Sequence, residues 1–129
     1  MSEPKIAREV AEAEVRRWAE QLGAEIPGGP PENVVRADMD GRIMFDEKAE
    51  TFLMRLRSPV AQENGETVTE LLLGEPTALQ LKDASKATKD DMEIASRLLS
   101  YITGKPLGII QRMRQRDLLL AGALLSFFA

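Results

Sequence analysis

The dipeptide Asn64-Gly65, placed between two apolar segments, is the feature that most constrains the fold of this chain. A type I′ turn needs positive φ at both central residues, and Asn and Gly adopt that conformation at low cost. The dipeptide therefore predicts a β-hairpin with a two-residue turn. In the register that follows, Val60 lies opposite Thr69 and Leu56 lies opposite Leu73.

One face of this hairpin should be apolar and the other largely charged. Pro59 cannot donate to a strand ladder, so the first strand should be an edge strand, at least near that residue. Arg57 falls near Glu70, which would pair opposite charges across the hairpin. An isolated hairpin is marginally stable in water, so its apolar face needs a cover, and the helical C-terminal half is the expected one. The apolar face would carry Leu56, Val60, Thr69, Leu71 and Leu73, and the other face Arg55, Arg57, Val68, Glu70 and Leu72.

Residues 3–22 have the apolar spacing of an amphipathic helix, with Ser2 as its cap and Gly23 after its last turn. Trp18 on the apolar side either docks this helix on the core or contacts a partner. Pro and Gly concentrate in residues 24–33, which predicts an irregular linker. We therefore divide the chain into an N-terminal extension, residues 1–33, and a domain, residues 34–129.

The segment between the linker and the hairpin is ambiguous. Residues 34–46 are interpreted as a second hairpin that turns at Asp40-Gly41. A calcium loop is the alternative, but it would place the cation of Arg36 where the metal needs a carboxylate. For residues 45–57 we predict a short helical or irregular piece up to about Ala49, followed by a strand.

Four helices are predicted after the hairpin, which gives an α+β fold class. They are a helix over 78–87 capped by Thr77, a helix over 89–103 capped by Thr88 and ended by Gly104, a short helix over 106–114, and a last helix over 118–128 capped by Asp117. The expected architecture is an N-terminal helix and Pro/Gly linker, then a β-hairpin packed against a C-terminal bundle of three to four short helices.

The composition argues against several function classes. The chain has no His and no Cys, which removes the commonest catalytic base, nucleophilic thiol and metal ligands. No phosphate loop or nucleophile elbow is visible, so we predict a protein that is not an enzyme and binds no cofactor or metal. The net charge of −4 makes nucleic-acid binding an unfavoured function. The run Arg112, Arg114 and Arg116 is interpreted as solvated surface, with a phosphate or acidic-partner contact as the alternative.

The apolar run from Leu118 to Phe128 spans 11 residues, whereas a bilayer crossing needs about 20, so no membrane span is predicted. A helix that is apolar all round is either a central core helix or a partly exposed interaction surface. Under the second interpretation, Leu125→Asp should abolish partner binding while the fold survives. The candidate partner-binding residues are Leu118, Leu119, Leu124, Leu125, Phe127, Phe128 and Trp18.

From about Phe52 onward, the order and spacing of several short motifs resemble the tail assembly chaperones of tailed bacteriophages, of the Mu-like and contractile-tailed type. The chain departs from the family pattern at Gln80, where an acidic residue is common, and residues 1–50 lie outside the resemblance. The motifs are Leu56, Pro59 and Val60, then Asn64-Gly65 with the segment 66–71, then Glu75-Pro76-Thr77, and finally Thr103-Gly104, Pro106, Asp117 and the apolar end.

The resemblance implies a non-enzymatic role in tail morphogenesis of a phage or prophage. Such proteins bind the long, apolar tape-measure protein, keep it soluble and help recruit tail tube protein. They act in the host cytoplasm and are not expected in the mature virion. Homo-oligomerisation stays open, as do two alternative functions: a structural tail subunit, and a small regulatory or nucleic-acid-binding helical module.

Overall fold

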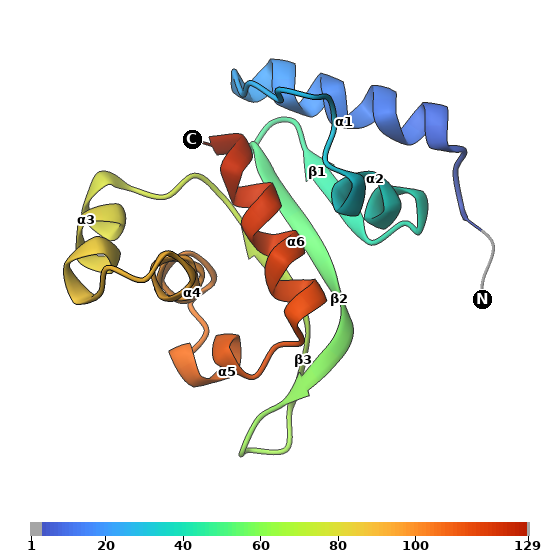
Figure 1. Cartoon of the computed structure of the whole chain (residues 1–129). Coiled ribbons are helices and arrows are strands. Elements are labelled where there is room, and N and C mark those ends of the chain that lie inside the picture. The colour runs from blue at the N-terminus through green and yellow to red at the C-terminus, as the bar shows by residue number, and fades with distance from the viewer. Residues whose placement is uncertain (1–3, 129) are drawn as a thin grey trace.

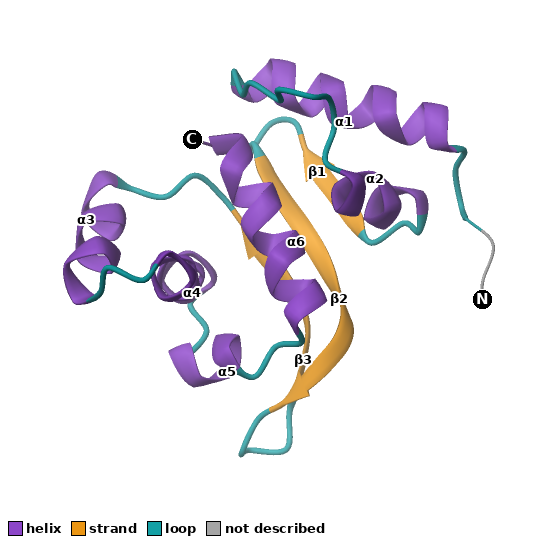
Figure 2. Ribbon diagram, viewed as in Figure 1, coloured by secondary structure: helices purple, strands orange, loops and turns teal. Residues whose placement is uncertain are grey.

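A three-stranded antiparallel sheet forms the centre of the structure, and helices pack on one of its faces (Figures 1 and 2). The computed structural model describes residues 4–128. In chain order the elements are α1 (Arg8–Leu22), α2 (Glu32–Met39), β1 (Ile43–Asp46), β2 (Thr51–Ala61), β3 (Thr67–Leu73), α3 (Ala78–Ala87), α4 (Asp91–Thr103), α5 (Leu107–Gln111), α6 (Gln115–Leu125) and the 3-10 turn η1 (Ser126–Phe128).

The layers follow from these elements. The strand order is β1-β2-β3, and α6 lies across one face of the sheet, with α2 on its β1 side and α4 on its β3 side (Figure 1). The predicted α+β class is thereby confirmed: N-terminal helix, hairpin and short C-terminal helices are all present. The sheet has one strand more than the predicted hairpin, because β1 pairs with β2.

The Asn64-Gly65 hairpin exists, but its turn is of another type. Gly65 donates to the carbonyl of Gln62 at 3.1 Å, and the amide of Gln62 donates to Glu66 at 2.8 Å. Gly65 has φ of +86°, while Asn64 is not among the residues with positive φ. This is a three-residue loop with glycine in the left-handed position, the second commonest hairpin solution. The predicted type I′ turn is wrong.

The predicted strand register is wrong as well, because the hairpin contains a bulge. Near the turn Val60 pairs with Val68, whereas at the far end Phe52 pairs with Leu73. The irregularity between residues 55 and 60 places four residues of β2 against a single residue of β3. As a result, Val68 is buried and Thr69 is exposed, the reverse of the expected faces.

The bulge also changes the predicted cross-strand contacts. Glu70 pairs with Arg55 and not with Arg57. β2 is the central strand, but β1 pairs with it only over residues 51–54, so β2 has no strand on that side at Pro59. The expectation of a locally unpaired edge at Pro59 therefore holds, although β2 as a whole is not an edge strand.

Residues 32–39 form helix α2 instead of the first strand of a second hairpin. The turn at Asp40-Gly41 is present, and Gly41 has φ of +72°. β1 begins at Ile43, so residues 45 and 46 are strand and not helical. Irregular chain over 47–50 and a strand from Thr51 agree with the prediction.

Phe52 is the centre of the core, where it joins both ends of the chain. Its fully buried ring contacts Trp18 of α1 at a centroid distance of 5.6 Å and Phe45 of β1 at 4.9 Å. Phe127 and Phe128 of η1 lie at 5.8 and 5.7 Å from the same ring. The rings meet tilted or edge to face, as aromatic quadrupoles favour. The N-terminal helix and the C-terminus therefore share one core.

Most helix ends follow from local chemistry. Thr77 forms a capping box with Gln80, and α1 and α4 end at Gly23 and Gly104 in the left-handed conformation, as predicted. α4 is capped by Asp90 and starts at residue 91 instead of 89. α1 starts at Arg8 instead of residue 3, and its expected cap, Ser2, lies outside the described residues.

Asp117 is a buried tether inside α6 and not the cap of that helix, which is a correction of the sequence-based assignment. Its Oδ1 accepts from the backbone amide of Arg57 at 3.0 Å and from the guanidinium of Arg42 at 3.2 Å. Its Oδ2 accepts from the amide of Ser58 at 3.0 Å. Arg114 occupies the cap position without a side-chain bond. Asp117 thus fixes α6 to the irregular stretch of β2.

Asp117→Ala should destabilise the fold by about 3 kcal/mol, because it leaves two amides and a partly buried guanidinium without their acceptor. The matched control is Asp90→Ala, which removes a true cap and should cost about 1 kcal/mol. Urea denaturation monitored by circular dichroism measures both. Equal losses for the two variants would contradict the tether.

A second buried carboxyl, Asp38, lies between α2 and α1. Burial raises the pKa of Asp38 to about 8, a hydrogen bond with Glu14 adds to the rise, and Arg17 acts in the opposite direction. Oδ2 of Asp38 has no hydrogen-bond partner among the described residues. A neutral carboxyl shared with Glu14 is the favourable state of this contact.

Stability should therefore fall as the pH rises from about 4 to about 8. In that range the unfolded chain has lost the Asp38 proton, at its usual pKa of about 3.9, while the folded chain retains it. Asp38→Asn should flatten this slope and be more stable than the parent at pH 8. The exposed neighbour provides the control Asp40→Asn, which should keep the parent slope. Urea midpoints across the pH range measure it, and an unchanged slope in Asp38→Asn would contradict the assignment.

Candidate partner-binding surfaces

The seven residues predicted to bind a partner lie together, but most of them are inside the molecule. Trp18, Leu124, Leu125 and Phe127 are buried, and Leu118 and Phe128 are partly buried against the core. Leu119 is the exception, with 47% of its surface exposed. The partner-binding role of this set stays a prediction, and in the described conformation only the side of α6 that carries Leu119 is open to another chain.

The open side of α6 has free space beside Leu119. Gly122 is one helical turn further on, and a Cβ built there would meet no atom within 4 Å. Positions three apart lie on the same helix face, so Leu119 and Gly122 border the same strip of surface. A leucine beside an open glycine lets another helix approach the backbone of α6 closely. We call this strip the α6 outer strip.

Large apolar side chains are also exposed elsewhere. α3 carries two of them, and α4 carries one in its first turn and another in its last. Isolated apolar side chains are normal on protein surfaces, so each alone indicates little. The exposed large apolar residues are Val10, Met44, Leu72, Leu79, Leu81, Met92, Tyr101 and Leu119.

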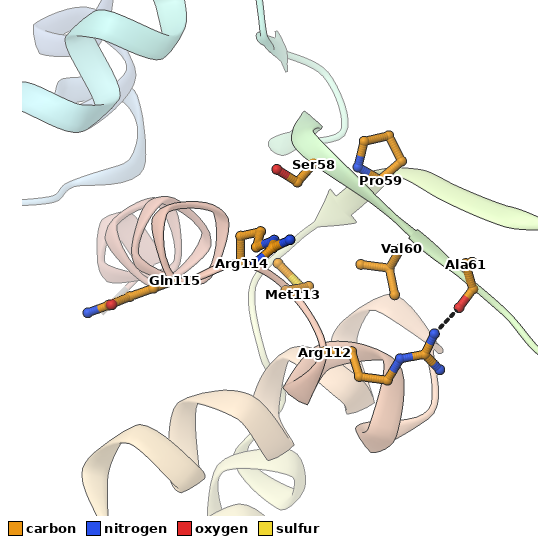
Figure 3. A pocket seen from close by; sticks show the side chains of 8 residues that line it. All are labelled: Ser58, Pro59, Val60, Ala61, Arg112, Met113, Arg114 and Gln115. Carbon is orange, nitrogen blue, oxygen red and sulfur yellow. Dashed lines mark hydrogen bonds between the residues drawn. The ribbon is translucent and has the colours of Figure 1, made fainter.

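A cationic groove lies where the bulged part of β2 faces the turn between α5 and α6 (Figure 3). It has a volume of about 430 Å³ and is lined by residues 58–61 on one side and 112–115 on the other. Arg112 donates across the groove to the carbonyl of Ala61. Arg114 lines both this groove and a neighbouring hollow that also contains Arg57 and Arg116.

The hollow beside the groove brings together cations that the sequence separates. Arg57 and Arg116 are 59 positions apart and both exposed, and within the described part of the chain neither forms an ion pair. The same holds for Arg112 and Arg114. Sequence reasoning found the run Arg112–Arg116 but missed Arg57, because only the bulge of β2 brings that residue to the turn. The arrangement suits carboxylate or phosphate groups.

Across residues 4–128, no three or more acidic or metal-ligating side chains gather as an ion site would require. Over the same residues, no helix combines the length and the apolar character needed to cross a bilayer.

Comparison with known proteins identifies the family. No curated protein and no solved structure matches the chain. A family model described as phage tail assembly chaperone proteins, E, or 41 or 14, matches residues 53–129. The match begins directly after Phe52 and spans the hairpin, α3 to α6 and the cationic groove. Since the match covers more than half of the sequence, the chain belongs to the phage tail assembly chaperone family.

Proposed function

We propose that this protein binds the tape-measure protein of its phage and keeps it soluble until the tail assembles. The observation that carries the proposal is the family match over residues 53–129. The proposed action is by contact and not by catalysis, in the host cytoplasm, and the chaperone leaves before the virion is complete. Tail tube protein is a further proposed partner.

The surface chemistry supports contact with an apolar, helical partner. A chaperone of this kind needs apolar groups in reach of the solvent together with a net charge that prevents its own association. The exposed leucines of α3 and α6 supply the first, and the charge of −4 supplies the second. The α6 outer strip is our proposed contact, because it is the open part of the apolar C-terminal run.

Two variants separate the proposed contact from the stability of the fold. Leu119→Asp places a carboxylate in the strip at an exposed position, so the fold should survive. Gly122→Leu fills the strip from a position where a Cβ meets no atom within 4 Å, and it should stabilise α6 by about 0.5–1 kcal/mol, since glycine is a poor helix former. Leu125→Asp is unsuitable, because Leu125 is buried and its replacement would disrupt the core.

Co-expression with the tape-measure protein, followed by measurement of its soluble fraction, tests the proposal. The parent chain should raise that soluble fraction. Both variants should bind the tape-measure protein at least about tenfold more weakly, equal to about 1.4 kcal/mol, and should therefore raise its soluble fraction less. Gln111→Asp is the control, because Gln111 is an exposed polar residue on a different helix, α5. If Leu119→Asp and Gly122→Leu both protect the tape-measure protein normally, the strip is not the contact. If the parent fails to protect it, the proposed function is wrong.

Mass spectrometry of purified particles tests the departure of the chaperone. The chain should be missing from finished virions and present in lysates of infected cells. Stoichiometric recovery from virions would instead favour the alternative of a structural tail subunit.

Binding of a polyanion is a second candidate function, favoured by the cationic groove. It predicts association with DNA that weakens steeply as salt is raised, because counterions are released from the phosphates. Arg114→Glu should then abolish a mobility shift seen with the parent at low salt. Without a shift for the parent, this candidate is removed.

A further inference from the structure

The face of the sheet opposite α6 carries an apolar row in register across all three strands. Met44 of β1 pairs with Leu53 of β2, and Leu53 pairs with Leu72 of β3. Met44 is 66% exposed and Leu72 is 56% exposed, with Leu53 between them and partly exposed. We call Met44, Leu53 and Leu72 the outer apolar row.

This row differs from the rest of its face. An antiparallel sheet with one covered face normally presents polar residues on the other. On both sides of the row that rule holds: the pair Arg55 and Glu70 lies on one side, and the pair Asp46 and Thr51 lies on the other. Three large apolar side chains that touch across adjacent strands form a contiguous patch. The helices cover the other face of the sheet, and no described element covers this row.

Charged side chains flank the row on both sides. On the side toward the hairpin loop, Arg55 is exposed and pairs across the strands with Glu70, which is exposed as well. Asp46 is exposed on the other side, and its Oδ1 accepts from the amides of residues 48 and 49, so its Oδ2 is open to another donor. The face therefore carries the cation Arg55 toward one end of the strands and the acid Asp46 toward the other end.

We propose that a second copy of this chain packs on the outer apolar row, related by a two-fold axis that runs along the row. Such an axis places each residue of the row opposite its own equivalent. The axis also reverses the strand direction between the two copies. Arg55 of each copy therefore lies opposite Thr51 of the other copy, and Asp46 is the cross-strand neighbour of that Thr51. The interface then has an apolar centre and two ion pairs, each between Arg55 of one copy and Asp46 of the other. Both copies contribute the same face.

The self-complementary charges of the face favour a second copy over a helix of another protein. The two-fold axis brings Arg55 of one copy beside Asp46 of the other, and two sheet faces pack at a separation of about 10 Å. Three strands about 4.8 Å apart and about seven residues long give a flat footprint of roughly 330 Å². Stable interfaces bury about 800 Å² on each partner. The dimer is accordingly weak and depends on protein concentration.

A single introduced thiol tests the axis directly. The chain contains no cysteine, so Leu53→Cys carries its only thiol, and the axis places that thiol opposite its copy. Facing sheets are too far apart for a direct disulfide, but a short bis-maleimide cross-linker spans the gap. Leu53→Cys should give a cross-linked dimer on a denaturing gel. Leu79→Cys is the control, because Leu79 is 65% exposed on α3, away from this face.

A charge placed on the row tests whether its apolar character holds the copies together. In the Leu53→Cys background, Leu72→Lys places two lysines opposite each other and should lower the cross-linked yield at least tenfold. Leu79→Lys in the same background should leave the yield unchanged. Circular dichroism should show the same thermal midpoint for both, because both positions are exposed. Sedimentation of the unmodified chain over a concentration series should show a monomer–dimer equilibrium.

Several results would overturn the proposal. One is a chain that stays monomeric at the highest concentration, and another is equal cross-linking of Leu53→Cys and Leu79→Cys. A dimer that Leu72→Lys leaves intact would place the interface elsewhere. A monomeric chain whose Leu72→Lys variant fails to protect the tape-measure protein would assign the face to that partner. The proposal is independent of tape-measure binding, since the sedimentation and cross-linking use this chain alone.

Discussion

The contact on which the rest of the structure depends is the meeting of Trp18, Phe127 and Phe128 around the ring of Phe52. These side chains come from the first helix, the central strand and the last turn of the chain. Large aromatic side chains bury more apolar surface than any other residues, and the geometry of the rings adds to that burial. The cluster therefore joins α1 and η1 to the same central strand. Helix α6 itself is internal because it packs on β2 and β3 and between α2 and α4.

The Asp117 tether then determines where α6 lies along the sheet. Its carboxylate accepts from two amides in the irregular stretch of β2, and Arg42 compensates its charge from the β1 side. Buried backbone donors need acceptors, so the bulge and the buried acid depend on each other. The same bulge brings Arg57 beside the turn that carries Arg114, which forms the charged hollow next to the cationic groove. One local irregularity in the hairpin thus positions both a helix and a charged surface.

How much the sequence could predict depended on how local the deciding contact is. Gly23, Thr77 and Gly104 act within one helical turn, and the helix ends they predict are present. Asp117 has its partners 59 to 75 residues away, so nothing nearby distinguishes it from a cap. The hairpin register failed because a bulge leaves no mark in an alternating pattern.

Two further errors have the same origin. Val34 and Val35 favour a strand, but both are buried in α2, where packing against α1 and α6 decides the conformation. The apolar run 118–128 was equally compatible with a core helix and an exposed surface, because its burial depends on the sheet, α2 and α4, which are distant in the sequence or not visible in its local pattern. For the candidate sites, the sequence shows which residues are apolar or cationic. It does not show which of them are exposed on the folded protein.

The distribution of covered and uncovered apolar groups bears on how a small chaperone remains soluble by itself. The largest side chains of the C-terminal run are inside, and the exposed large apolar groups lie in separate places: on α1, on α3 and α4, on α6 and in the outer apolar row. Separate small patches surrounded by charge associate weakly, whereas one large patch would aggregate. Several weak contacts on a long partner can still act together, because each bound site raises the effective concentration at the next. A fold that buries its most apolar segment and exposes several smaller patches is therefore compatible with the proposed retention of a long apolar partner.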